Sequence, residues 1–143
     1  SFKRNTLSAV NAIKLNQETL AKNTGSILLY STIAVKQGFT NHTIVSTAKG
    51  AVEGLTLSLA AEFAPKIKVN CIAPSLTDAK MTQKLLNNET IKKAIENMHP
   101  LPKIGSGDDF SDIGSFLLSD KNSWITGQIF HIDGGRSSLR IKS

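Results

Sequence analysis

The sequence has few cysteines and no long hydrophobic run. Cys71 is the only cysteine, so no disulfide can form within the chain, which suits a reducing compartment such as the cytoplasm. No apolar run approaches the roughly 20 residues that a membrane-spanning helix needs. The first ten residues also lack the continuous apolar core of a signal peptide. We therefore expect a cytoplasmic protein with no membrane partner.

Aromatic residues and clustered charge are also scarce. Aromatic side chains make up 6% of the chain, and the formal net charge is +6. The lysines and arginines are spread from Lys3 to Lys142 and are not interleaved with aromatic residues. A nucleic-acid surface usually needs a clustered basic footprint, so we expect no nucleic-acid partner. A weak attraction to anionic metabolites is a better use of this charge.

A glycine-rich phosphate loop is missing as well. Dinucleotide-binding folds hold the pyrophosphate with a turn of the type G-x-G-x-x-G at a helix N-terminus. Gly50 and Gly54 fall inside an expected helix, and Gly134 and Gly135 follow an expected strand. Packing and turn formation explain these glycines better than contact with a phosphate.

The residues that are present predict one domain over 1–143 with alternating helices and strands. Hydrophobic residues make up 40% and charged residues 20% of the chain, as in ordinary globular proteins. Periodicity predicts helices over 5–22, 46–64, 81–86, 91–98 and 106–118, and strands over 26–31, 67–73 and 128–132. This alternation is typical of an α/β protein with a parallel sheet and right-handed crossovers. An average sheet has about five or six strands, so one edge of this sheet is expected to be unfinished.

The stretch from Ser46 to Pro74 organises the rest of the chain. Its first part carries an amphipathic stripe with the spacing of a helix. The stripe consists of Ala48, Ala51, Val52, Leu55, Leu59, Ala60 and Phe63. Lys49 places a single cation near the start of this helix, among small neighbours.

The same stretch, STAKGAVEGLTLSLAAEFAPKIKVNCIAPS, resembles the second half of a short-chain dehydrogenase/reductase. The resemblance continues through HPLPKIG (99–105), FLLSD, WITGQ and HIDGG (131–135), in the same order and spacing. It implies a Rossmann-like three-layer fold, of which this chain forms the C-terminal half. The phosphate loop of that family lies in the first half, which we expect to be absent here through truncation or cleavage, or to lie in another chain.

The resemblance also implies an active site of the form Ser…Tyr-x-x-x-Lys, assisted by Asn. Lys49 matches the lysine, Asn5 the asparagine, and Thr32 or the adjacent Ser31 the serine. In the family the lysine holds the nicotinamide ribose and lowers the pKa of the tyrosine, which exchanges a proton with the substrate oxygen. The serine hydroxyl holds that oxygen, and the asparagine supports a water relay.

The tyrosine position of that pattern is occupied by Val45. Valine cannot exchange a proton, and Tyr30 lies in an expected strand at the wrong spacing. His42 is the nearest alternative acid or base, because histidine changes charge near neutral pH. The segment resembles an atypical family branch with the pattern HxxVxxxK, which puts ordinary alcohol–ketone chemistry in doubt.

Further site residues follow from the resemblance. Pro74, Leu76 and Thr77 resemble the PGxxxT turn that lies against nicotinamide, with Ser75 in place of the usual glycine. Residues 75–107 are polar and broken by proline and glycine, and we expect them to form the substrate lid. No metal site is expected.

Two functions remain open at this point. One is an NAD(P)-dependent oxidoreductase acting on an alcohol or carbonyl of a small molecule, with the N-terminal cofactor loop outside this chain. The other is a non-catalytic relative that senses the cofactor or assists assembly, for which Val45 is the main argument.

In both cases we expect a homodimer or homotetramer through helices 5–22 and 46–64, which carry apolar and small residues over a wide arc. A complementary N-terminal half would lie beside strand 26–31. The choice between NAD and NADP is open, because the discriminating residues belong to the first half.

Overall fold

The computed structural model describes residues 2–78 and 82–141 of the chain. Helices and strands alternate along it, with a π-helix at the start. The elements in chain order are η1 (Lys3–Leu7), α1 (Ser8–Lys22), β1 (Ser26–Tyr30), α2 (Thr43–Phe63), β2 (Lys68–Pro74), α3 (Gln83–Leu86), α4 (Glu89–Glu96), α5 (Asp108–Leu118) and β3 (Ile129–Ile132).

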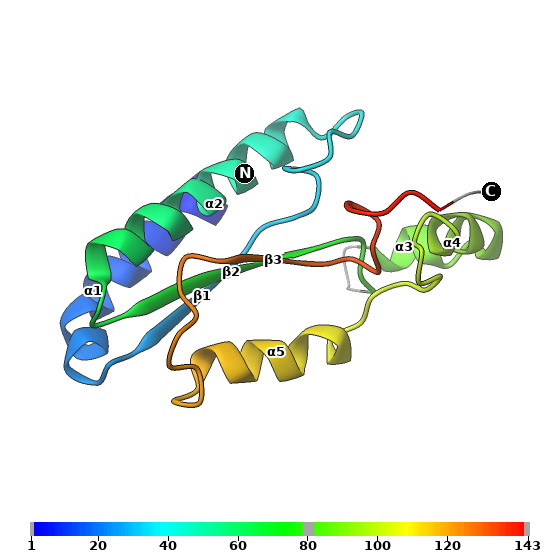
Figure 1. The fold of residues 1–143 in the computed structure, drawn as a ribbon. Coiled ribbons are helices and arrows are strands. Elements are labelled where there is room, and N and C mark those ends of the chain that lie inside the picture. The colour runs from blue at the N-terminus through cyan, green and yellow to red at the C-terminus, as the bar shows by residue number, and fades with distance from the viewer. Residues whose placement is uncertain (1, 79–81, 142–143) are drawn as a thin grey trace.

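The strands form one three-stranded parallel sheet in the order β1-β2-β3. Helices α1 and α2 lie on one side of the sheet and α5 on the other, while α3 and α4 lie beyond one end of the strands (Figure 1). This is the three-layer, Rossmann-like α/β arrangement that the alternation of elements predicts, so the fold prediction is confirmed. The described strands leave β1 and β3 as the two edges of the sheet.

Several element boundaries differ from the prediction. Helix α2 begins at Thr43 rather than Ser46, so the expected loop ends at His42 and Val45 is helical. The first helix opens with a five-residue π-helix that periodicity did not indicate. Helix α3 is shorter than expected and α4 begins at Glu89, whereas Met81, the predicted start of the former, lies outside the described residues.

The buried stripe of α2 also differs from the prediction. Its buried residues are Ala48, Val52, Thr56, Ala60 and Phe63. Thr56 is buried although it was not part of the expected stripe. Its burial is tolerated because its hydroxyl donates a 2.8 Å hydrogen bond to the carbonyl oxygen of Val52 within the same helix. Leu55 and Leu59 lie at the margin of the stripe and are only partly buried.

Strand β2 is the centre of the molecule. Its residues from Val69 to Ala73 are buried without alternation, because helices cover both faces of the sheet. The core between the sheet, α1 and α2 is formed by Ile13, Ala60, Phe63, Ile67 and Val69. Cys71 is fully buried, and this burial, followed by the nearby Glu53 carboxylate, raises the pKa of its thiol to about 11. The thiol is therefore a packing group at neutral pH.

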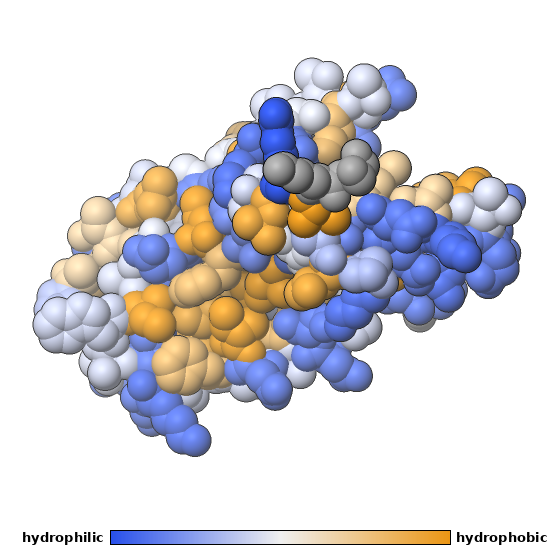
Figure 2. All heavy atoms as spheres, turned by 45° about the vertical axis from the view of Figure 1, so that its right-hand side comes forward, coloured by the Kyte–Doolittle hydropathy of each residue, from blue (hydrophilic) through white to orange (hydrophobic). Residues whose placement is uncertain are grey.

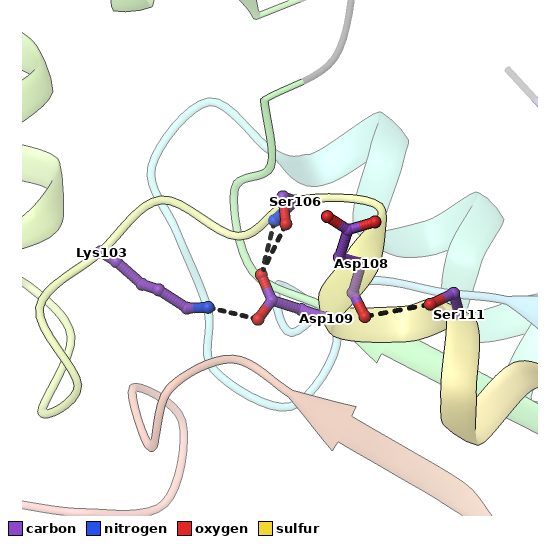
Figure 3. A network of polar contacts seen from close by, with 5 residues as sticks. All are labelled: Lys103, Ser106, Asp108, Asp109 and Ser111. Carbon is purple, nitrogen blue, oxygen red and sulfur yellow. Dashed lines mark hydrogen bonds and ion pairs between the residues drawn. The ribbon is translucent and has the colours of Figure 1, made fainter.

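Helix α5 begins at a small polar network (Figure 3). The Asp109 carboxylate accepts hydrogen bonds from the Ser106 backbone N–H at 2.7 Å and from the Ser106 hydroxyl at 3.1 Å. Lys103 donates to the other carboxylate oxygen and forms an ion pair with it. The Lys103 hydrogen bond, followed by those from Ser106, lowers the pKa of Asp109. The expected capping start is present only in part. Helix α5 begins at Asp108 rather than Ser106, and its cap residue Gly107 makes no side-chain hydrogen bond, but the Asp109 carboxylate accepts from the Ser106 N–H three residues before it.

Large hydrophobic side chains are also exposed. Figure 2 shows hydrophobic side chains gathered across the middle of one face, with hydrophilic ones toward the right-hand end. Over the whole surface, the exposed large hydrophobic residues on η1, α1 and α2 are Leu7, Leu15, Ile44, Val45 and Leu57. Among the described residues, no helix combines the length and apolar character needed to cross a bilayer.

Candidate active site

The candidate site lies where the three parallel strands end. The Ile33 N–H donates to the Pro74 carbonyl at 3.0 Å, and the Ser75 N–H donates to the Ile132 carbonyl at 3.4 Å. These bonds hold the segments after β1, β2 and β3 side by side beyond the sheet. In open α/β sheets ligands bind at this carboxyl edge.

A cavity of about 620 Å³ opens at this edge. Its size is within the range of small-molecule and cofactor sites. Side chains from the segments after β1, β2 and β3 and from α3 and α4 surround it. Its lining includes Thr32, Phe39, His42, Ser75, Leu76 and Arg136.

Thr32, rather than Ser31, faces this cavity. The Ser31 side chain is buried and donates a 2.6 Å hydrogen bond to the Glu53 carboxylate. The Thr32 hydroxyl oxygen accepts only a 3.3 Å hydrogen bond from the Ala34 N–H among the described contacts, so its own proton is available to a ligand. Of the two residues that could match the family's serine, Thr32 is therefore the better placed to bind a ligand.

Lys49 is held at the end of β1. Its Nζ donates a 2.7 Å hydrogen bond to the Tyr30 carbonyl oxygen, and no other hydrogen bond of its ammonium involves a described residue. Burial lowers the pKa of Lys49, and the Cys71 thiol opposes this shift. Val45 lies four residues earlier on α2 and is 43% exposed. Residues at this spacing project from the same side of a helix.

His42 stands directly before α2 and lines the cavity. Its Nδ1 lies 2.8 Å from the Thr40 carbonyl oxygen, which can only accept, so Nδ1 carries the proton. In the neutral ring, Nε2 then keeps its lone pair, and no hydrogen bond to it involves a described residue. The imidazole also packs edge-on against Phe39, with ring centroids 5.5 Å apart.

Asn5 lies in the middle of the π-helix η1. The next residue, Thr6, is buried and donates a 3.1 Å hydrogen bond to the Ala48 carbonyl oxygen. This bond fixes the backbone beside Asn5 against the part of α2 that carries Lys49. Single π-turns of this kind recur at functional sites.

Pro74, Leu76 and Thr77 lie at the exit of β2. Leu76 lines the larger cavity and also a second one of about 150 Å³, whereas Thr77 lines only the second. Thr77 pairs with Gly105 in an isolated parallel bridge. The structure thus brings Thr32, His42 and Leu76 into one cavity, whereas Asn5, Lys49, Pro74 and Thr77 do not line it.

Sequence reasoning missed three connected side chains: Arg136 and Ser75, which line this cavity, and His99, which lines the second one. Arg136 Nη1 donates to the Ser75 hydroxyl at 3.3 Å, and Ser75 Oγ lies 2.8 Å from His99 Nε2. His99 Nδ1 lies 2.8 Å from the Ile95 carbonyl oxygen, so that nitrogen carries the proton and, in the neutral ring, Ser75 donates to Nε2. The only sequence signal was Ser75 standing where the resembled family has glycine.

Arg136 also stacks on Phe39. Its guanidinium carbon lies 4.7 Å from the ring centroid, within cation–π range. Its Nη2 lies 3.4 Å from the Met98 sulfur. Burial lowers the pKa of Arg136, and the charge of Asp133 opposes this shift.

The turn after β3 places Arg136. Asp133 is buried, and its carboxylate accepts 2.9 Å hydrogen bonds from the N–H groups of Gly135 and Ser137. Burial acts to raise the pKa of Asp133, but the bonds from Ser137 and Gly135 outweigh it, so the pKa is lowered. Gly134 and Gly135 have φ of 60° and 87°, a region that favours glycine.

The described residues contain no cluster of His, Cys, Asp and Glu able to hold a metal ion. They fit one end of a nicotinamide cofactor, because Lys49 keeps ammonium donors for ribose hydroxyls beside the exit of β2. A glycine-rich phosphate loop is absent from the sequence, so these residues do not account for the pyrophosphate.

A parallel sheet covered on both faces, with polar groups converging at its carboxyl edge, defines a protein of the Rossmann-like α/β class. The family model described as "Enoyl-(Acyl carrier protein) reductase" matches residues 1–137. The chain therefore belongs to the short-chain dehydrogenase/reductase family, and it is related to oxidoreductases.

Individual relatives agree with this assignment. The chain is 34% identical over 113 residues to tropinone reductase-like 3 of Erythroxylum coca, covering 79% of this chain and 44% of that protein. It is 36% identical over 112 residues to the 3-oxoacyl-[acyl-carrier-protein] reductase FabG of Chlamydia trachomatis, covering 78% and 44%. A solved structure titled "ElxO with NADP Bound" aligns with a TM-score of 0.87 and 33% identity, covering 94% of this chain and 56% of that one. The chain thus spans about half the length of the relatives it matches.

Proposed function

We propose that this chain forms the substrate-binding and catalytic part of an NAD(P)-dependent oxidoreductase that interconverts a small-molecule alcohol and carbonyl. The observation that carries the proposal is the convergence of Thr32 and His42 in one cavity, with Lys49 anchored beside it. The oxidoreductase names of the relatives support the same reaction class.

Thr32 would hold the substrate oxygen. Its hydroxyl proton is free of described acceptors and faces the cavity, so it can donate to a carbonyl oxygen or to the oxygen of an alkoxide. A donor placed where negative charge develops stabilises the transition state more than the ground state. Its neighbour Ser31 would only secure the loop, because its hydroxyl is already bound to Glu53.

His42 would replace the missing phenol as acid or base. Val45 has no proton to exchange, whereas His42 Nε2 can accept one while Nδ1–H stays on the Thr40 carbonyl. The contact with Phe39 restricts the orientation of the imidazole. Transfer through a positioned histidine is worth about 10²–10⁴-fold in rate.

A nicotinamide cofactor would supply or accept the hydride when bound. Lys49 would hold its ribose, and Pro74, Leu76 and Thr77 would lie against the nicotinamide. Asn5 would support a water relay between Lys49 and solvent. The phosphate loop would come from a complementary N-terminal half beside β1, outside residues 1–143. The structure titled with NADP supports a cofactor of this kind without deciding between NAD and NADP.

Residues 75–107 would act as the substrate lid. Five of the cavity-lining residues, Ser75, Leu76, Leu85, Ile95 and Met98, come from this region. The whole protein would work in the cytoplasm as a homodimer or homotetramer through helices 5–22 and 46–64. The exposed Leu15 and Leu57 on these helices support that arrangement. The alternative, a non-catalytic subunit, rests on Val45 alone.

Cofactor binding and turnover by the purified full-length protein test this proposal. We expect NADH or NADPH to bind and a panel of ketones to be reduced slowly, with His42→Gln lowering the rate by about tenfold or more. Gln37→Asn changes a nearby exposed side chain in the same loop and serves as the control. Cofactor binding without any turnover would favour the non-catalytic alternative, and absence of cofactor binding would contradict both.

A further inference from the structure

The cavity that contains Thr32 and His42 has an unbalanced charge. The guanidinium of Arg136 lies in its wall, and no described residue that lines the cavity is an aspartate or glutamate. The described ion pairs do not include Arg136 either. A cation withdrawn from water is costly unless an anion accompanies it, so this wall favours a negatively charged occupant.

Asp133 offsets this cation only in part. Its carboxylate attracts the guanidinium but forms no described ion pair or hydrogen bond with it, and its two oxygens accept the N–H groups of Gly135 and Ser137. Its carboxylate therefore shapes the turn that carries Arg136. The remaining attraction leaves the cation fixed in place and able to bind a further anion.

The guanidinium is held in one orientation from several sides. Phe39 supports its face, Ser75 accepts from Nη1, and the Met98 sulfur lies beside Nη2. Ser75 is itself oriented by His99, which is 3% exposed and anchored to the Ile95 carbonyl oxygen. A glycine at position 75 would break this chain of hydrogen bonds between Arg136 and α4.

The contacts just described leave other guanidinium N–H donors for a ligand, since an arginine has more donors than these contacts use. A planar guanidinium fixed in this way matches the geometry of a carboxylate, which can accept two parallel hydrogen bonds from it. The cavity volume of about 620 Å³ leaves room for such a group together with the reacting carbon near Thr32.

We propose that Arg136 binds a carboxylate group of the substrate, with Ser75 and His99 as positioning residues. The inference rests on the proposed oxidoreductase function and narrows its substrate class to hydroxy or oxo acids. The carboxylate would be held at the Arg136 wall while Thr32 holds the oxygen that reacts.

Calorimetric titration of the purified full-length protein with succinate tests the binding step without cofactor or turnover. We expect succinate to bind, neutral succinamide to bind at least about tenfold more weakly, and Arg136→Gln to weaken succinate by about 10- to 100-fold, as for a charge-assisted pair. The control Arg140→Gln removes an exposed arginine from the same C-terminal segment and should leave succinate binding unchanged.

The positioning role has its own readout. Ser75→Ala should weaken succinate binding by several-fold, whereas Ser75→Thr, which keeps the hydroxyl, should restore it. In turnover, Arg136→Gln should raise KM for oxo acids and leave KM for neutral ketones unchanged. Equal binding of succinate by wild type and Arg136→Gln, or of succinate and succinamide by wild type, would overturn the inference.

The outcomes separate this inference from the proposed function. Arg136-dependent binding of succinate by a protein that binds no nicotinamide cofactor would uphold the carboxylate site and contradict the oxidoreductase. Reduction of neutral ketones with no effect of Arg136→Gln on any acid substrate would uphold the oxidoreductase and contradict the carboxylate site.

Discussion

The ammonium of Lys49 donates a 2.7 Å hydrogen bond to the carbonyl oxygen of Tyr30, the last residue of β1. This bond joins α2 to the carboxyl end of the edge strand. It also holds a half-buried cation one helical turn from Val45. If Val45 occupies the proton-transfer position, as proposed, the positive charge that would activate a phenol there is still present.

Lys49→Met should separate the functional and structural roles of this bond. Loss of the hydrogen bond to the strand end should lower the unfolding free energy by about 1 kcal/mol or less. The loss is small because the substitution also removes a charge whose partial burial destabilises the folded state. Affinity for the nicotinamide cofactor should fall by about tenfold or more, as expected for loss of a charged donor to ribose. Urea unfolding and fluorescence titration of the full-length protein measure the two quantities.

The control for this variant is Lys66→Met, because Lys66 is exposed and distant from β1 in the chain. It should change neither quantity. If Lys49→Met bound the cofactor as tightly as wild type, the role proposed for Lys49 would be wrong.

Val45→Tyr should raise carbonyl-reductase activity. Val45 is 43% exposed, so a larger side chain can enter without opening the core. A phenol at this position would lie one turn from Lys49, whose charge lowers the pKa of a neighbouring phenol. Because His42 is proposed to act as acid or base already, the gain in kcat should be smaller than the roughly 10²–10⁴-fold worth of a sole positioned proton donor, and steady-state assays with a panel of ketones measure it.

Ile44→Tyr is the matched control, because Ile44 is exposed at the neighbouring position and does not share the face of Lys49. It should leave kcat unchanged. No gain for Val45→Tyr, with cofactor binding intact, would indicate that Thr32 or Asn5 is not placed for catalysis.

The sequence was sufficient for the fold because its apolar periodicity matches the layers. SILLY and VNCIAP predict strands that helices cover, and the structure pairs them in parallel. Details that depend on single hydrogen bonds were not predictable in this way. Thr56 is buried because its hydroxyl returns to the Val52 carbonyl, and periodicity treats it as polar and exposed.

The candidate site was predictable only in part, for a related reason. Thr32 was expected from the resemblance to the family's serine, and His42 because it is the acid or base nearest to Val45 along the chain. Arg136 lines the larger cavity and His99 the smaller one. Both lie far along the chain from Thr32 and His42, and only the folded turn after β3 brings Arg136 to Ser75. No short-range sequence pattern predicts such a long-range contact.

Acid should destabilise the turn that carries Arg136. The pKa of Asp133 is lower in the folded protein than its ordinary value of 3.8, so its contribution to stability is present above about pH 4 and is lost as the pH falls through the folded pKa. Asp133→Ala should cost about 1–3 kcal/mol of unfolding free energy at pH 7, because two part-buried N–H groups lose their acceptor.

The unfolding free energy of Asp133→Ala should also depend less on pH than that of wild type between pH 5 and pH 3. Chemical denaturation at a series of pH values measures this slope. Asp120→Ala, which removes an exposed carboxylate with no described hydrogen bond, is the control. Equal slopes for wild type and Asp133→Ala would show that Asp133 does not contribute in this way.

Self-association through α1 and α2 should depend on their exposed leucines. Leu15 is 86% exposed and Leu57 52% exposed, so an interface that covers them would remove apolar surface from water. A two-fold symmetric interface needs one self-complementary patch, so a charge placed in it is repeated in both copies.

We expect Leu15→Glu and Leu57→Glu each to shift the full-length protein toward monomer. Ile91→Glu on α4, where the side chain is also exposed, should leave the assembly intact. Sedimentation velocity at micromolar concentration distinguishes these states. A wild-type protein that sediments as a monomer, or an assembly unaffected by both leucine substitutions, would place the interface elsewhere or remove it.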